Sequence, residues 1–215
     1  MVVAIDGPSG VGKSTAARAA AAALGIPHLD TGVYYRLATL ICLVAGVDPG
    51  DDAGVLAALE GVEIDFGPEG RILLDGVDVS ERLRAPDVTG AVSLVSAHPL
   101  VRAALVGMQR AWVAARGGDA VVEGRDIGTV VFPDAPVKVF LTADVTVRAR
   151  RRARDAEAAG ADLDDLAAQI MRRDHLDSSR AASPLRPADD AVIIDTSHVS
   201  TAEVVRRILD LVGAV

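Results

Sequence analysis

The feature that most constrains the fold of this chain is a glycine-rich segment that directly follows a short apolar run. The run Val2–Asp6 has the composition of a buried strand, and the next residues are Gly7-Pro8-Ser9-Gly10-Val11-Gly12-Lys13-Ser14. They fit the pattern G-x-x-x-x-G-K-S, and the pattern over 14–24 is typical of a helix. Between a strand and a helix, such a loop presents backbone N–H groups to a polyphosphate. The sequence therefore predicts a phosphate-binding loop, and a glycine-rich turn without a ligand is the weaker alternative.

The composition allows one α/β domain and excludes several classes of protein. The chain has 215 residues, of which 50% are hydrophobic and only 3% aromatic, so its core is built from Ala, Val, Leu and Ile. The net charge of −8 argues against a nucleic-acid partner. We expect neither a transmembrane helix nor a signal peptide, because no long uncharged apolar run and no basic leader segment is present. Cys42, the single cysteine, is expected in the core of a cytoplasmic protein that binds no membrane.

Strands alternate with helices along most of the sequence. We predict buried strands over 2–6, 28–30, 120–123, 137–141 and 191–195. Helical patterns lie over 14–24, 33–45, 52–60, 98–116, 144–159, 163–178 and 201–212. This alternation predicts a five-stranded parallel sheet with helices on both faces.

One segment departs from this alternation. Residues 62–66 and 71–75 alternate between apolar and polar at period two across the turn 67–70, and 76–79 is a candidate third strand. The pattern predicts a small antiparallel insertion in the parallel core.

The glycine-rich loop fits a kinase better than other nucleotide-binding classes. A regulatory GTPase needs an Asn-Lys-x-Asp motif, and the only lysine outside the loop is Lys138, which lies in no such motif. Gly10 and Gly12 lack the third glycine of a dinucleotide-binding fingerprint, and Val11 stands where a G-x-S-x-G hydrolase needs glycine. The run 191–195 superficially matches a Walker B strand, but it comes late and is interpreted as the last core strand.

In a kinase, this loop wraps the phosphates of the nucleotide donor. Lys13 bridges the β- and γ-phosphates, and the Ser14 hydroxyl ligates Mg²⁺. The residues predicted to bind the ATP phosphates are Gly7, Pro8, Ser9, Gly10, Val11, Gly12, Lys13, Ser14 and Thr15.

Further charged segments are suited to other phosphates. They are 29–36, 123–133 and 172–180, and each contains an arginine beside a helix or strand end. In 123–133, an arginine and an aspartate follow a buried strand, where open α/β sheets bind ligands. Residues 148–154 contain five arginines, which indicates either a solvated helix with ion pairs or a basic flap over phosphates. Each segment alone could also be a set of surface ion pairs.

With these motifs the chain resembles the bacterial cytidylate kinases, which are nucleoside monophosphate kinases. The resemblance runs from Val3 to about Leu211. It rests on Ile5–Gly10, Asp30-Thr31-Gly32-x-x-Tyr35-Arg36, Gly124-Arg125-Asp126-x-Gly128-Thr129-Val130-Val131-Phe132-Pro133 with the residues up to Lys138, and Arg173–Leu185.

The family resemblance implies an α/β P-loop kinase core with a five-stranded parallel sheet, a small antiparallel insertion and an arginine-rich helical lid. The whole chain, 1–215, is then one P-loop kinase domain. Its core covers about 1–32, 98–147 and 175–215. The region that binds the nucleoside monophosphate (NMP) covers about 33–97, with the insertion at about 62–80, and the lid covers about 148–165.

The resemblance also implies a reaction, in which the γ-phosphoryl group of Mg-ATP passes to CMP or dCMP in pyrimidine metabolism. Mg²⁺ is the expected cofactor, and the family suggests a monomer. The expected catalytic residues are Lys13, Arg125, Arg148 and Arg152. The residues that match the CMP-binding positions of the family are Thr31, Arg36, Ser93, Arg102, Arg125, Asp126, Arg173, Asp177 and Arg180.

The residue types agree with this substrate. Cytosine presents an amino group as donor and two acceptors, so it suits an acid on one side and an arginine on the other. Asp126 would face a carbonyl oxygen in uracil and reject it. His28, His98, His175 and His198 show neither metal nor triad spacing, and none is assigned a role.

Two alternatives remain open from the sequence. One is a P-loop kinase for another acceptor, such as AMP, UMP or shikimate. The other is a nucleotide-binding switch or ATPase that transfers nothing to a small molecule.

Overall fold

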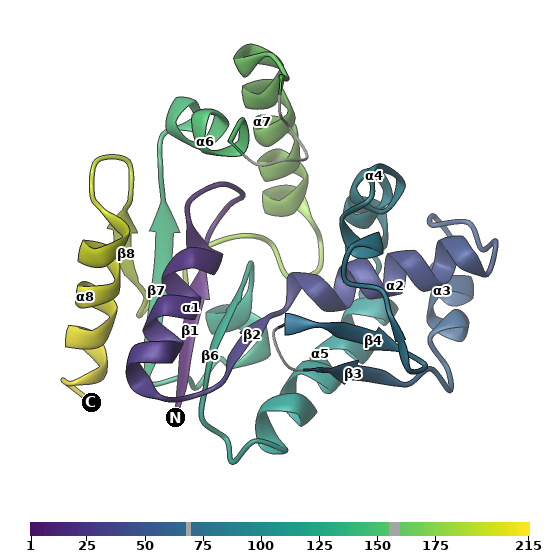
Figure 1. The fold of residues 1–215 in the computed structure, drawn as a ribbon, viewed down its shortest axis with the longest axis horizontal. Helices are drawn as coiled ribbons and strands as arrows, with labels where there is room; N and C mark the ends of the chain where they lie inside the picture. Colours follow the sequence, from purple (N-terminus) through teal and green to yellow (C-terminus); the bar gives the residue numbers. More distant parts are fainter. Residues whose placement is uncertain (68–69, 155–159) are drawn as a thin grey trace. The chain divides into compact units, whose positions relative to one another are not determined.

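The fold consists of two compact units, described from a computed structural model of the chain (Figure 1). The structure describes residues 1–67, 70–154 and 160–215. Unit 1 comprises residues 1–31 and 109–215, and unit 2 comprises residues 32–108. The predicted division into core, NMP-binding region and lid stays a prediction.

The centre of unit 1 is a parallel sheet. Its strands are β1 (Val2–Asp6), β2 (His28–Asp30), β6 (Ala120–Gly124), β7 (Val137–Thr142) and β8 (Val192–Asp195), in the order β2-β6-β1-β7-β8. All four neighbouring pairs are parallel. Each strand coincides with a predicted one, so the predicted five-stranded parallel sheet is confirmed.

Helices of unit 1 cover this sheet and extend beyond it. They are α1 (Lys13–Leu24), α6 (Val145–Arg152), α7 (Leu163–Ser179) and α8 (Thr201–Val212), while α5 (Pro99–Ala114) begins in unit 2 and ends in unit 1. Ala16, Ala17 and Ala20 of α1 share a buried cluster with Val204 and Ile208 of α8 and with strand residues. Because alanine is small, α1 can pack closely against the sheet. The loop that joins β1 to α1 begins at Gly7, directly after the end of β1.

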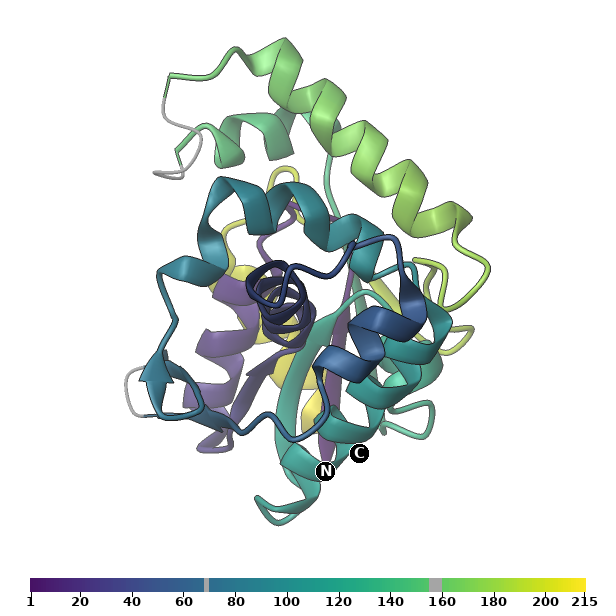
Figure 2. The ribbon, with the colours of Figure 1, turned by 90° about the vertical axis from the view of Figure 1, so that its right-hand side faces the viewer.

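The helices α6 and α7 form a separate pair in unit 1 (Figure 2). Ala149 of α6 packs against Leu166 and Ile170 of α7 in a cluster of their own. The predicted helix over 144–159 ends at Arg152, and residues 155–159 lie outside the described residues.

Unit 2 combines helices with a small antiparallel sheet. Its elements are α2 (Gly32–Val44), α3 (Asp52–Ala58), β3 (Ile64–Phe66), β4 (Ile72–Leu74), β5 (Val77–Asp78), the 3-10 helix η2 (Arg82–Arg84) and α4 (Pro86–Val95). The sheet order β3-β4-β5 is antiparallel throughout, so the predicted insertion with a third short strand is confirmed. Residues 68–69 of the predicted turn lie outside the described residues. Leu37, Leu40, Ile72, Leu83 and Val88 form the buried cluster of this unit.

Three described helical elements were not predicted, and one of them is the short 3-10 helix η2. The helix α4 begins at Pro86, directly after the extended residue Ala85, and proline at the first helical position is a usual start signal. The segment Ile127–Val131, labelled η3, is a short π-helix that begins three residues after β6 ends, where the family motif gave no helical periodicity.

Among the described residues, no single helix is both long and apolar enough to cross a membrane. The helices α4 and α5 together have the length and apolar composition of a membrane span, but the pair is bent by 104°.

Candidate active site

The loop between β1 and α1 has the backbone that a phosphate-binding loop requires. Gly7 has φ 148°, and a Cβ atom there would lie 2.3 Å from the carbonyl oxygen of Leu141, so only glycine fits. Gly10 has φ 78°, and a Cβ atom there would lie 3.1 Å from Cβ of Arg148. The first glycine allows the chain to turn at the strand end, and the second allows α6 to approach the loop.

Lys13 is buried at the start of α1, where its ammonium group folds back over the loop. Its Nζ donates a hydrogen bond of 2.7 Å to the carbonyl oxygen of Pro8. Burial lowers the pKa of Lys13 to about 7, and the nearby Arg125 guanidinium acts in the same direction, while Glu123 and Asp30 oppose the shift. A bound polyphosphate would favour the charged form, so this lysine is suited to neutralise phosphate oxygens.

The next residue, Ser14, is hydrogen-bonded to the buried carboxylate of Glu123, a residue that was not among the predicted site residues. Ser14 Oγ donates to Glu123 Oε2 at 2.8 Å, and Glu123 Oε1 lies 2.9 Å from His28 Nε2. Glu123 is only 2% exposed and lies in β6, next to β1 in the sheet. An acidic residue near the carboxyl end of a buried strand beside the loop was the sequence signal that could have identified it.

The same two side chains are chemically suited to Mg²⁺. A hydroxyl and a carboxylate are hard oxygen donors, which this ion prefers over nitrogen or sulfur. Ser14 and Glu123 therefore fit the ion that accompanies a nucleoside triphosphate.

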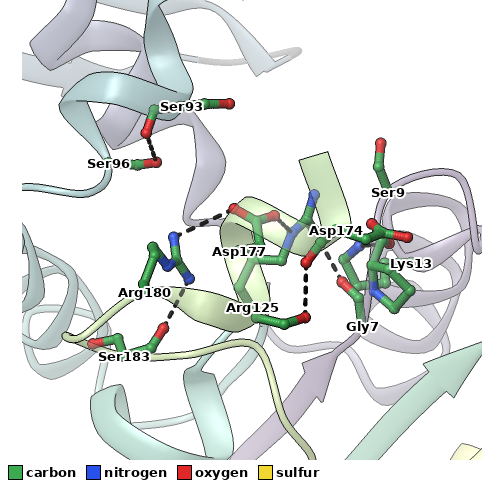
Figure 3. Close-up of polar contacts among 12 residues, drawn as sticks. Gly7, Ser9, Lys13, Ser93, Ser96, Arg125, Asp174, Asp177, Arg180 and Ser183 are labelled. Carbon is green, nitrogen blue, oxygen red and sulfur yellow. Dashed lines mark hydrogen bonds and ion pairs between the residues drawn. The ribbon is translucent and has the colours of Figure 1, made fainter. Parts of the chain in front are cut away.

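Asp177 of α7 joins two of the predicted phosphate-binding arginines (Figure 3). Arg125 Nε donates to Asp177 Oδ2 at 2.9 Å, and Arg180 Nη1 lies 3.5 Å from Asp177 Oδ1. Arg125 Nη1 also donates to the carbonyl oxygen of Gly7 at 3.0 Å. Asp177 is buried, so it holds both guanidinium groups from one position beside the loop.

The arginines of α6 also contact the phosphate-binding loop. Arg148 is buried, and its Nη1 donates to the carbonyl oxygen of Ser9 at 3.2 Å and to the Asp174 carboxylate. Arg151, which was not among the predicted site residues, donates to the carbonyl oxygens of Val11 at 3.3 Å and of Thr196 at 2.6 Å. Arg152, one of the predicted catalytic residues, is half-buried on the same helix.

Thr31 and Asp126 lie at the carboxyl end of the sheet in unit 1, and Arg173 lies on α7. Thr31 Oγ1 donates to the carbonyl oxygen of Glu123 at 2.8 Å, and Thr31 and Asp126 are each 3% exposed. Asp126 lies two residues after the end of β6 and directly precedes η3. Its position agrees with the rule that open parallel sheets bind ligands at the carboxyl ends of their strands.

The remaining predicted CMP-binding residues belong to unit 2. Arg36 Nη1 of α2 donates to the carbonyl oxygen of Leu83 at 2.8 Å and to Thr89 Oγ1 at 2.9 Å. Arg102 is 3% exposed; it donates to the carbonyl oxygen of Ser96 at 2.9 Å and lies 5.0 Å from the Tyr35 ring centre. Ser93 lies on α4, and its carbonyl oxygen accepts a 3.1 Å bond from the Ser96 hydroxyl (Figure 3).

Comparison with known proteins identifies the family. The family model described as cytidylate kinase matches residues 3–214 of this chain. The chain belongs to the cytidylate kinase family. A cytidylate kinase of Mycobacterium avium is 52% identical over 217 residues, which cover 99% of this chain and 95% of the relative. A cytidylate kinase of Corynebacterium glutamicum is 52% identical over 219 residues, which cover 100% of this chain and 95% of the relative.

A solved structure supports the fold of this cytidylate kinase family member. An uncharacterized protein from Eubacterium ventriosum superimposes with a TM-score of 0.54, and the match covers 100% of this chain and 99% of that protein. The two sequences are 13% identical, so the likeness concerns the fold alone.

Proposed function

We propose that the chain transfers the γ-phosphoryl group of Mg-ATP to CMP or dCMP, giving CDP or dCDP and ADP. Membership of the cytidylate kinase family supports the reaction. The observation that carries the proposal is that Arg125 and Arg148, from separate segments of unit 1, both donate to carbonyl oxygens of the phosphate-binding loop. A switch or simple ATPase does not need this second set of fixed cations.

The donor phosphates are bound by the loop itself. Its backbone N–H groups and Lys13 neutralise the β- and γ-phosphates. Ser14 would hold Mg²⁺, and Glu123 would orient the Ser14 hydroxyl from inside the sheet. When bound, the ion supplies further neutralisation of charge on the phosphate oxygens.

Catalysis rests on positioning and charge neutralisation rather than on a general base. The second pKa of a phosphate monoester is about 6, so the acceptor is largely a dianion at neutral pH and attacks without losing a proton to the protein. Lys13, Arg125, Arg148 and Arg152 neutralise the charge that develops during transfer. The proposed lid is about 148–165, of which 155–159 lie outside the described residues; its closure over the phosphates would exclude water, which would otherwise hydrolyse ATP.

CMP binding is proposed for the residues that match the CMP-binding positions of the family. Arg36, Arg125 and Arg180 bind the acceptor phosphate, because planar guanidinium groups suit phosphate oxygens. Arg173 and Asp177 bind on the ribose side. Thr31, Ser93, Arg102 and Asp126 recognise the base, with Asp126 accepting from the cytosine amino group.

The proposal includes the setting of the enzyme. The chain acts as a monomer in the cytoplasm, in pyrimidine metabolism, on small molecules alone. The net charge of −8 supports the absence of a nucleic-acid partner.

An acceptor panel tests the proposed function. ADP release from Mg-ATP is measured without an acceptor and with CMP, dCMP, UMP, AMP or shikimate. We expect strong stimulation by CMP and dCMP and weak stimulation by UMP. Stimulation by AMP or shikimate alone would overturn the acceptor assignment, and acceptor-independent hydrolysis would indicate an ATPase.

A further inference from the structure

A buried carboxylate at the end of the central strand holds the segment that follows β6. Asp6 is the last residue of β1 and is 4% exposed. Its Oδ1 accepts the N–H of Ile127 and its Oδ2 accepts the N–H of Gly128, both at 2.8 Å. Both carboxylate oxygens are therefore used to fix two successive backbone amides.

The first of these bonds determines how Asp126 is presented. The N–H of Ile127 belongs to the peptide group whose carbonyl is that of Asp126. This carbonyl oxygen accepts bonds from Val130 at 2.9 Å and Val131 at 3.1 Å. The peptide plane is thus held at both ends, and the direction in which the Asp126 side chain leaves the backbone is fixed with it.

The contact between these two segments is reciprocal. Arg125 Nη1 donates to the carbonyl oxygen of Gly7, the residue directly after Asp6. Residues 6 and 7 therefore hold positions 125, 127 and 128 from both sides of Asp126. The register of the sheet makes this possible, because Asp6 lies opposite Gly124.

We propose that Asp6 is a positioning residue for CMP recognition, because its carboxylate fixes the segment 125–128 against the phosphate-binding loop. This inference rests on the proposed function, in which Arg125 binds the acceptor phosphate and Asp126 reads the base. Asp6 itself touches neither substrate. It acts through the backbone on which both side chains are carried.

The charged form of Asp6 is costly to hold in this buried place. Burial raises the pKa of Asp6 to about 6, the bonds from Gly128 and Ile127 oppose this shift, and the Asp126 carboxylate raises it further. Lys13 offers partial compensation. A carboxylate in this place offers a separate acceptor oxygen to each of the two N–H groups, whereas a serine or threonine side chain has only one oxygen.

Asp6→Asn is the test variant, because it has nearly the same shape but places an NH₂ group against one of the two N–H donors. We expect the KM for CMP to rise roughly tenfold and the KM for ATP to change less than about twofold. The preference for CMP over UMP in kcat/KM should fall roughly tenfold, because Asp126 is no longer held in place. An equal rise for ATP and CMP would show that Asp6 acts through Lys13 and would overturn the inference.

A matched control separates positioning from loss of stability. Ile208→Val shortens a fully buried side chain on α8 that does not contact residues 125–128 by any described bond. We expect this variant to be less stable but to keep the CMP and UMP kinetics of the original enzyme. If Ile208→Val shows the same CMP-selective loss as Asp6→Asn, the effect is one of stability and the inference fails.

Hydrogen exchange tests the contact without relying on catalysis. In the original chain the amides of Ile127 and Gly128 should be protected, and Asp6→Asn should speed their exchange roughly tenfold or more while β1 stays protected. Fast exchange of these amides in the original chain would overturn the inference even if Asp6→Asn does not fold. If Asp6→Asn does not fold, Asp6→Glu replaces it as the test variant. This substitution moves both carboxylate oxygens by one methylene and should show the same CMP-selective loss, and unchanged KM values would overturn the inference.

The two proposals fail in different ways. If the original chain does not phosphorylate CMP, the proposed function falls, and the role of Asp6 in CMP recognition falls with it. If the original chain phosphorylates CMP but Asp6→Asn has unchanged KM values and base preference, only the present inference is overturned.

Discussion

The two units of the molecule place their charged side chains in different environments. Among the described residues, unit 1 buries Asp6, Lys13, Glu123, Asp126, Arg148 and Asp177, and the buried charged side chain of unit 2 is Arg102. Unit 2 instead carries exposed pairs such as Arg82 with Asp87. These charged side chains of unit 1 are thus withdrawn from water, whereas most charged side chains of unit 2 are solvated.

This difference shows where each unit can contribute. Buried charges that are already fixed interact strongly with a developing charge, because they need no reorganisation at the moment of reaction. Such side chains are suited to the chemical step, while Arg36 and Arg102 of unit 2, which donate to backbone carbonyl oxygens, are suited to substrate binding. We therefore expect substitution of Lys13 in unit 1 to lower kcat most strongly, and substitution of Arg102 in unit 2 to raise mainly the KM for CMP.

The largest expected effect is that of Lys13→Ala. Removing the ammonium group from the donor phosphates should lower kcat roughly 1,000-fold, which corresponds to about 4 kcal/mol in the barrier. The fold should survive, because the hydrogen bond from Lys13 to the carbonyl oxygen of Pro8 is lost but the glycine conformations that shape the loop remain. Steady-state kinetics and circular dichroism test this, with the exposed Arg206→Ala as control. Near-normal turnover would contradict the assignment of the loop.

The next effect concerns the pH dependence of stability. The pKa of Asp6 is raised from 3.8 to about 6 in the folded protein, so the folded state holds a proton that the unfolded state has lost. As pH rises from about 4 to about 6, this proton is lost and the free energy of unfolding falls by about 3 kcal/mol relative to Asp6→Asn. Urea unfolding of both proteins between pH 4 and pH 8 measures the difference.

Asp87 of unit 2 should behave in the opposite way. Its hydrogen bonds with Arg82 lower the pKa to about 2, so its stabilising contribution is present above about pH 4 and is lost as pH falls toward 2. If the free energy of unfolding depends on pH in the same way in the original chain, Asp6→Asn and Asp87→Asn, the proposed difference between the carboxylates of the two units is contradicted.

The third effect is that of Asp177→Asn. The substitution removes the charge that holds Arg125 and Arg180, and we expect kcat/KM for CMP to fall roughly 30-fold, or about 2 kcal/mol. The KM for ATP should stay within about twofold. Asp189→Asn, at an exposed carboxylate beside Arg186, is the control and should change neither value. A loss of kcat/KM that is confined to ATP would show that Asp177 acts in ATP binding and not in CMP binding.

Arg102→Lys tests unit 2 directly. Lysine keeps the charge but loses the planar fork that donates to Ser96 and lies over Tyr35. We expect the KM for CMP to rise roughly tenfold, or about 1.4 kcal/mol, with kcat changed by less than about twofold. A fall in kcat with constant KM would show that unit 2 also acts in the chemical step.

The smallest effect is expected for Arg82→Ala. Arg82 and Asp87 form an exposed pair, which competes with water and contributes little to stability. Kinetic constants should be unchanged within error, and the melting temperature should shift by less than about 2 °C. A large kinetic effect would show that this surface takes part in substrate binding.

Much of the architecture followed from local patterns. The five strands and the antiparallel insertion were predicted because burial on both faces and alternation at period two leave visible signatures in the sequence. The helix α4 was not predicted, because Thr89 and Gly90 weaken its helical pattern and its start depends on Pro86. The π-helix Ile127–Val131 has no such local signature, since it is held in part by Asp6 from another strand.

The phosphate-binding loop and the phosphate-binding arginines could be predicted from residue type and glycine spacing, because both are local properties. The partner of each side chain became known only from the folded chain. Ser14 meets Glu123, Arg125 meets Asp177 and Arg148 meets Asp174, across separations from 26 to 109 residues. These pairs depend on the register of parallel strands and on the packing of α6 against α7, and neither is encoded in the periodicity of one segment.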